Sequence, residues 1–172
     1  MAPLRRTVGA LLPLLAACTP ALDWREVRPA DSDALALFPC KPGRYARTVP
    51  LAGAPVKMHL ASCKAQDTTY AIAYATVAAP AQVTPALDQL RRAAAANIGA
   101  TPTASDWTVG GMTPNPLAQK LAMQGHDAQG KPVQEQAVFF VRGLRVYQAT
   151  MIGPMLDPAA AETFFSGLKL LA

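Results

Sequence analysis

Polar and hydrophobic residues alternate along several stretches of this chain, and a period of two is typical of half-buried β-strands. The alternation is clear in residues 56 to 64 (VKMHLASCK) and in residues 68 to 77 (TTYAIAYATV), where tyrosines and an isoleucine share one face. The second stretch is also rich in β-branched and aromatic residues, which favour strands. Further strands are expected in a stretch ending at Leu51, in one beginning at Trp107, and in residues 118 to 125, 133 to 142 and 144 to 152.

Two other stretches have the spacing of helices. Leucine and alanine recur at helical intervals between Thr84, an expected N-cap, and Gly99, an expected helix end. A closing helix is expected after the cap residue Asp157, with an apolar face that reaches Leu171. The order β-β-β-α-β-β-β-β-α predicts an α+β fold, with a mainly antiparallel sheet of about six to seven strands packed with two helices.

The beginning of the chain has the layout of a secretory signal peptide. Arg5 and Arg6 make it basic, and residues 7 to 17 form an uncharged, mostly apolar run ending in small side chains. This run is too short for a membrane-spanning helix, which needs about 20 apolar residues. We therefore assign residues 1 to 17 to a cleaved signal, residues 18 to 34 to a tether, and residues 35 to 172 to a single α+β domain.

The end of the signal, Leu15-Ala16-Ala17-Cys18, resembles the bacterial lipobox, in which the cysteine becomes the first mature residue. The resemblance implies a diacylglyceryl group on the Cys18 sulfur and a protein held at a membrane by its lipid chains. Thr19 follows the cysteine, and a residue other than aspartate there resembles the outer-membrane sorting pattern of enteric bacteria. We expect an outer-membrane lipoprotein facing the periplasm; the inner membrane, and a plain secretory signal with an incidental cysteine, are the alternatives.

Of the three cysteines, Cys18 ends the lipobox-like segment, and Cys40 and Cys63 lie in the exported part of the chain. If Cys18 carries lipid, Cys40 and Cys63 remain, and the oxidising exported compartment permits a disulfide between them. We expect that disulfide, and two unpaired buried thiols are the alternative. No metal site and no cofactor are expected, because the chain has two histidines and no CxxC motif.

The charges of the mature chain are few and unevenly placed. Without residues 1 to 17 it has 14 basic and 11 acidic side chains, a net charge of +3 that does not require a nucleic-acid partner. Residues 34 to 66 contain no acid. They hold the five residues of a candidate basic surface, Lys41, Arg44, Arg47, Lys57 and Lys64. Close to a lipid anchor, these cations are suited to anionic headgroups or lipid A phosphates; the alternative is a solvated face balanced by Asp67, Asp88 or Glu135.

Residues 110 to 119 (GGMTPNPLAQ) pair poorly in a sheet, because they hold two glycines, two prolines and an asparagine. They predict an exposed, shaped loop, and such loops often carry recognition. The candidate partner-binding residues are Met112, Thr113, Pro114, Asn115 and Pro116. A rigid connector is the alternative.

A second resemblance covers most of residues 35 to 171. The segments ALALFPCKPGR, YAIAYATV and ETFFSGLKL, with a helix and a long hairpin between the last two, look like the PsbP-like α/β/α sandwich. That fold includes extrinsic subunits of photosystem II and many bacterial lipoproteins, and the chain also resembles small uncharacterised lipoproteins of Gram-negative bacteria. The resemblance implies a non-catalytic domain that binds partners, and it supplies no catalytic residues.

Catalytic motifs are absent from the sequence. There is no G-x-S-x-G nucleophile elbow, and Gly110-Gly111 lacks the lysine and hydroxyl residue of a phosphate-binding loop. His59 lies in an expected strand and His126 in an expected turn. We expect no enzyme but a lipid-anchored envelope protein with a binding or assembly role, whose partner is another envelope protein. A carrier or sensor of a small apolar ligand, held between sheet and helix, is the first alternative, and a hydrolase is the second.

Overall fold

A seven-stranded antiparallel sheet forms the centre of the protein in the computed structural model, which describes residues 22–171. Its strands lie in the order β3-β4-β5-β9-β8-β7-β6. Their bounds are β3 Gly43–Leu51, β4 Ala54–Ala65, β5 Thr68–Thr76, β6 Thr103–Asp106, β7 Gln119–His126, β8 Pro132–Arg142 and β9 Arg145–Gly153. The predicted α+β class, with a mainly antiparallel sheet and two helices, is confirmed.

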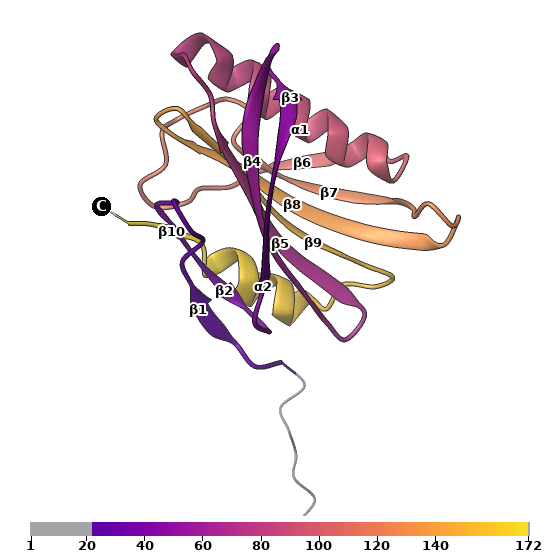
Figure 1. Ribbon diagram of the computed structural model, residues 1–172. Coiled ribbons are helices and arrows are strands. Elements are labelled where there is room, and N and C mark those ends of the chain that lie inside the picture. The colour runs from indigo at the N-terminus through magenta and orange to yellow at the C-terminus, as the bar shows by residue number, and fades with distance from the viewer. Residues whose placement is uncertain (1–21, 172) are drawn as a thin grey trace, which may run out of the picture.

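One helix packs on each face of this sheet (Figure 1). A short 3-10 turn, Pro80–Gln82, leads into α1, Val83–Asn97, on one face, and α2, Pro158–Ser166, lies on the other. A small sheet of β1 (Arg25–Val27), β2 (Ala34–Phe38) and β10 (Lys169–Leu170), in the order β1-β2-β10, lies beside α2. The protein therefore has three layers: α1, the large sheet, and α2 with the small sheet.

The alternation along β5 divides the interior into two cores. Tyr70, Ile72 and Tyr74 point toward α2 and are buried there with Phe38 of β2 and Phe164 of α2. The intervening alanines of β5 point toward α1, where the second core contains residues of α1, β7, β8 and β9. Burial of each large apolar side chain contributes roughly 1.5 to 3 kcal/mol before conformational entropy is subtracted, so both helices are held mainly by these faces.

The folded domain begins earlier than the sequence indicated. Residues 22–34, which were assigned to the tether, contain β1, and β1 pairs with β2 in antiparallel register. Trp24 packs edge-on against Tyr70, with 6.0 Å between the ring centroids. The absence of a clear period in this segment is explained by the shortness of β1, because three residues are too few to establish an alternation.

The end of the chain also differs from the prediction of a helix whose face reaches Leu171. Asp157 does cap α2, since its carboxylate accepts a hydrogen bond from the Ala159 amide. However, α2 ends at Ser166 because the chain turns at Gly167, where a side chain would clash with Leu37 of β2. The next residues form β10 instead, which pairs with β2.

Two boundaries in the middle of the chain also differ. The helix begins at Val83 with Gln82 as N-cap, two residues before the expected N-cap Thr84. The strand expected from Trp107 is wrong, because β6 precedes that residue and residues 107–118 form a loop. The four residues of β6 are all exposed, so they carry no hydrophobic alternation that would reveal a strand.

Cys40 and Cys63 form the disulfide predicted from the sequence. It joins the loop that follows β2 to β4, with 6.1 Å between the two Cα atoms. The bond therefore couples the small sheet to β4, the second strand of the large sheet, across 23 positions of the chain.

Removal of this disulfide is expected to destabilise the domain. In the chain-entropy model, a loop of this length stabilises the folded state by about 3 kcal/mol, which corresponds to roughly 6 to 12 °C in Tm for a domain of this size. The measurement is thermal unfolding followed by circular dichroism, with and without dithiothreitol. The double variant Cys40→Ser/Cys63→Ser should melt like the reduced wild type and be insensitive to the reductant. Equal Tm values for oxidised and reduced wild type would contradict the prediction.

Candidate functional site

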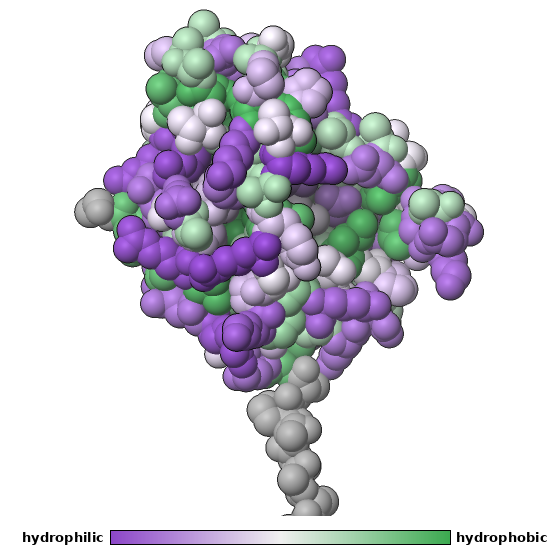
Figure 2. All heavy atoms as spheres, in the orientation of Figure 1, coloured by the Kyte–Doolittle hydropathy of each residue, from purple (hydrophilic) through white to green (hydrophobic). Residues whose placement is uncertain are grey.

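Among the hollows found on residues 22–171, a groove between α1 and the hairpin formed by β3 and β4 has the greatest volume. Its volume is about 770 Å³, which lies in the range of small-molecule sites, roughly 300 to 1,000 Å³. In Figure 2 hydrophobic residues lie in a hollow beside this hairpin and below α1. Apolar side chains form much of its lining, among them Val49, Leu51, Met58, Leu60, Ala73 and Leu90. The groove is open along one side and is not an enclosed cavity.

The groove exists because β5 presents small residues on this face. Ala73 forms part of its floor, whereas the opposite face of the same strand carries Tyr70, Ile72 and Tyr74. α1 packs its buried side, which includes Leu87 and Ala94, over β8 and β9. The space between α1 and β4 is therefore left unfilled.

Side-chain hydrogen bonds hold the two walls of the groove together at one end. The amide of Gln89 in α1 donates to the Pro50 carbonyl (3.0 Å), and its oxygen accepts from the Ala52 amide (2.9 Å). Gln82, just before α1, also donates to the Ala52 carbonyl (3.4 Å). Since three contacts fix the tip of the hairpin to the first half of α1 and the residue before it, the groove is built into the fold.

Polar groups gather at the rim of the groove. Arg47 of β3 lines it and is exposed, and no carboxylate of residues 22–171 lies within ion-pair distance of its guanidinium. Tyr45 is 64% exposed, an unusual fraction for an aromatic residue. Asn97, Gln148 and Gln89 complete the polar part of the lining. The site thus combines an apolar interior with one free cation at its edge.

The five cations of the candidate basic surface do not form one surface. The register of β3 with β4 places Arg47 on the α1 face of the hairpin and Arg44 on the opposite face. Lys64 forms an ion pair with Asp67 (3.8 Å), and Lys57 is exposed on the face that carries Arg44. Lys41 precedes β3 and lines a second, open concavity with Arg44.

Of the three acids considered as balancing charges, Asp67 alone pairs with one of these cations. Asp88 pairs instead with Arg92, four residues further along α1. Glu135 is buried in β8 and forms no ion pair among the described residues. Most of the positive charge of residues 34 to 66 is therefore left uncompensated by direct ion pairs.

The candidate partner-binding loop is tied closely to the domain. Met112 packs on the core beside α2, and the Thr113 amide donates to the Val141 carbonyl (2.7 Å). Asn115 donates to the hydroxyl of Thr84 in α1 (2.9 Å). Thr113, Pro114 and Pro116 remain exposed. The loop is consequently a fixed connector that presents a small exposed surface.

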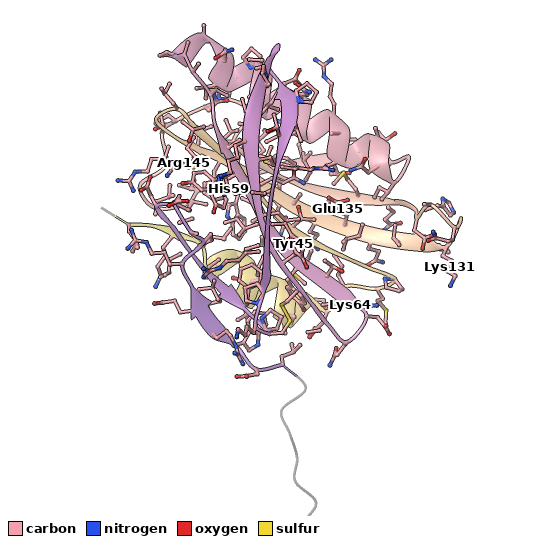
Figure 3. The ribbon with its side chains drawn as sticks, viewed as in Figure 1. Tyr45, His59, Lys64, Lys131, Glu135 and Arg145 are labelled. Carbon is pink, nitrogen blue, oxygen red and sulfur yellow. A yellow bond between two sulfur atoms is a disulfide. The ribbon has the colours of Figure 1, made fainter. Side chains whose placement is uncertain are left out.

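The two histidines lie in different strands, His59 in β4 and His126 in β7, and neither lines the groove. His59 stacks on Tyr74, with 5.1 Å between the ring centroids, and burial raises the pKa of the Tyr74 phenol. His126 is exposed at the end of β7. Figure 3 shows His59 and Tyr45 on opposite sides of the hairpin, so His59 does not face the groove. Within residues 22–171 no cluster of three histidine, cysteine, aspartate or glutamate residues is suited to a metal ion.

The predicted lipidation residue, Cys18, lies outside the described residues. In the part of the chain that the structure describes, no helix is both long and apolar enough to cross a membrane.

Glu135 is a buried acid that the sequence analysis treated as a surface charge. It lies in β8 between Val133 and Ala137, and its cross-strand neighbours are Met123 and Ile152. Its side chain is 5% exposed, and this burial raises the pKa of the carboxyl from 4.5 to about 7 (Figure 3). The carboxyl is thus mostly neutral below pH 7.

Signals for both the groove and Glu135 were present in the sequence. Glu135 has the same parity as Val133, Ala137 and Phe139, so the alternation itself placed it on a buried face. The alanines that alternate with the large residues of 68 to 77 mark a second face of the same strand, one without bulk. What sequence periodicity does not give is where a helix lies on such a face.

Comparison with known proteins provides no guide to the role of this site. No protein-family description, no curated protein and no solved structure matches the chain at a significant level.

Replacement of Glu135 is expected to change how stability depends on pH. Because the folded-state pKa is about 7 and the ordinary value is 4.5, the unfolded chain releases this proton first. The wild type therefore loses about 3 kcal/mol of unfolding free energy as pH rises from 4 to 8. Glu135→Gln should remove this loss and be the more stable protein at pH 8. Urea unfolding at several pH values between 4 and 8 measures the free energy of unfolding. The control Glu26→Gln, at an exposed position, should show the same decrease as the wild type. An equal decrease in Glu135→Gln would refute the prediction.

Proposed function

We propose that this protein is a lipid-anchored envelope protein facing the periplasm, and that it binds an apolar ligand without catalysing a reaction. The observation that carries the proposal is the groove between α1 and the β3–β4 hairpin, which is preformed and lined with apolar side chains. Pockets of this size with a few polar groups at their edge are the usual form of small-molecule sites.

The lining of the groove favours an amphiphile with one acyl chain. An alkyl chain matches the apolar lining formed by Met58, Leu60 and Leu90, and burying it there releases about 25 cal/mol for each Å² removed from water. The open side admits a long ligand without a conformational change. Arg47 at the rim is suited to an anionic head, because its guanidinium has no carboxylate partner among the described residues. A fatty acid or a lysophospholipid meets both requirements.

The surroundings of the groove support a non-catalytic role. Its lining holds neither histidine nor cysteine and no carboxylate, the residues that most often supply the general base and nucleophile of hydrolases. Its one phenol, that of Tyr45, is largely exposed. The sequence resemblance to PsbP-like domains, which implies binding without catalysis, agrees with this.

The anchor is inferred from the lipobox-like residues that end at Cys18. The Cys40–Cys63 disulfide supports export, because disulfides persist in oxidising compartments and are rare in the cytosol. Outer-membrane sorting rests on Thr19, which stands where an aspartate would mark retention.

Binding of laurate, measured by isothermal titration calorimetry, tests the groove. Ala93 lies on α1 and lines the groove, so Ala93→Phe should fill part of it and weaken binding at least tenfold. Ala96→Phe is the matched control, because Ala96 is exposed on the same helix and does not line the groove. It should bind laurate within twofold of the wild type. Absence of laurate binding by the wild type, or equal loss in both variants, would overturn the groove as the site.

The same assay tests the polarity of the ligand. Arg47→Gln should weaken laurate binding about fivefold, the effect of an exposed ion pair worth about 1 kcal/mol, and should leave binding of dodecanol unchanged. An equal effect on both ligands would show that Arg47 contributes packing and not charge.

Lipidation is tested by mass spectrometry of the protein extracted from membranes with detergent. The N-terminal peptide should begin at Cys18 and carry the mass of the attached acyl chains. Cys18→Ala should leave the protein without lipid and shift it out of the membrane fraction. The apolar run of residues 7 to 17 would be the remaining hydrophobic segment, and it is too short to anchor the protein well. An unmodified N-terminal peptide in the wild type would contradict the anchor.

Binding of an envelope protein through residues 112–116 is the second candidate function. It is favoured by the way the loop is held, since hydrogen bonds to Val141 and Thr84 fix it while Pro114 and Pro116 stay exposed. A fixed surface loses little conformational freedom on binding. In-cell crosslinking should then recover a specific protein whose yield falls when both prolines are replaced by serine.

A further inference from the structure

A second concavity, separate from the groove, lies between β1 and the start of β3. Its volume is about 720 Å³, and it is lined by Arg25, Arg28, Lys41 and Arg44 with a single acid, Glu26. Hydrophilic side chains cover this part of the molecule in the view of Figure 2, over β1 and the beginning of β3. Four cations facing one open hollow make it the most basic concave surface among those found on the described residues.

Most of these cations are available to a ligand. Arg25 forms an ion pair with Asp23. Arg28, Lys41 and Arg44 have no carboxylate within ion-pair distance among residues 22–171. The Arg44 guanidinium donates to the Arg28 carbonyl (3.5 Å), and that of Arg28 donates to the Ser32 carbonyl (3.4 Å). These contacts hold the two arginines beside each other without neutralising their charge.

The concavity also lies close in sequence to Cys18, the predicted lipidation residue. Its first lining residue, Arg25, lies seven positions after Cys18. Seven residues of fully extended chain span at most about 25 Å. If lipid is attached at Cys18, the part of the domain that carries β1 is held within that distance of the membrane surface.

We propose that this basic concavity, formed by Arg28, Lys41 and Arg44, binds the phosphates of anionic phospholipids in the membrane that holds the anchor. This inference rests on the proposed lipid anchor for its geometry. It adds a second membrane contact, one that sets the orientation of the domain. Each lysine or arginine near an anionic surface contributes about 1 kcal/mol, and the short tether keeps the cations within reach of it. Membrane phosphate is favoured over a protein partner because the hollow is open and almost uniformly basic.

The test uses the mature chain from residue 18 with Cys18→Ser, so that lipid cannot hold the protein to the membrane. Co-sedimentation is measured with vesicles of phosphatidylcholine alone and with vesicles containing about a third phosphatidylglycerol. We expect binding to the anionic vesicles alone, weakened by added salt. Lys41→Gln/Arg44→Gln should lower the partition coefficient about tenfold to thirtyfold, as two cations at about 1 kcal/mol each predict.

The matched control is Arg92→Gln/Lys131→Gln, which removes the same charge from α1 and from the turn between β7 and β8. Lys131 lies on the far side of the molecule from β1 (Figures 1 and 3). This control should bind anionic vesicles within twofold of the parent chain. Equal losses of vesicle binding in the two double variants would show that only net charge matters, and would overturn the site. Equal binding of the parent chain to neutral and anionic vesicles would also overturn it. Inorganic phosphate is the competitor for the same site. If it abolished vesicle binding at low millimolar concentration, the membrane surface would be overturned as the ligand.

Failure of this proposal can be told apart from failure of the proposed function. The state of Cys18 is read by mass spectrometry, and laurate binding is read by calorimetry, and neither measurement involves Lys41 or Arg44. The double variant should bind laurate like the wild type, which also shows that it is folded. If the double variant loses vesicle binding but retains laurate binding, the site is supported. If it loses both, the variant is unfolded, and the single variant Lys41→Gln is tested instead. That variant should lower partitioning into anionic vesicles about fivefold.

Discussion

The unequal faces of β5 are the constraint on which the rest of the structure depends. This strand lies near the middle of the large sheet, between β4 and β9, and its sequence alternates large residues with alanine. The large residues need a deep layer to cover them, which α2 and the small sheet provide through Phe164 and Phe38. The alanines give α1 little bulk to pack against, so α1 lies over β8 and β9 and leaves a groove at its side. One alternating strand thus produces a filled core on one face and an open site on the other.

The small sheet closes the first of these layers and connects the two ends of the chain. β2 is its central strand and pairs with β1 from the beginning of the domain and with β10 from its end. Asp33, next to β2, forms an ion pair with Arg145 of β9 (3.0 Å), and the Cys40–Cys63 disulfide ties the chain after β2 to β4. Since these links fix β1 and β2 to both halves of the large sheet, a force or restraint applied at the N-terminal end reaches the whole domain.

Elements with a strong internal period could be predicted from the sequence, and those defined by their neighbours could not. β4, β5, β8 and β9 have long alternations, and the cysteine pairing followed from the number of cysteines and their compartment. β1 and β10 have three and two residues, so their existence depends on pairing with β2. The end of α2 depends on the contact of Gly167 with Leu37, which lies far away in sequence. Residue type alone suggested a basic surface that includes Lys41 and Arg44. The fact that Arg47 lies on a different face could be known only from the register of β3 and β4.

That register gives β3 charged residues on both faces of the hairpin. As an edge strand it exposes backbone groups on its outer side, and arginines and Pro50 along it protect against pairing with another chain. The same arginines belong to different sites, because Arg44 faces the basic concavity and Arg47 the rim of the groove. Three residues of strand separate them by about 10 Å. The register puts them on opposite faces of the hairpin, so on the proposed roles membrane phosphates and an amphiphile would be bound on opposite sides of the same edge strand.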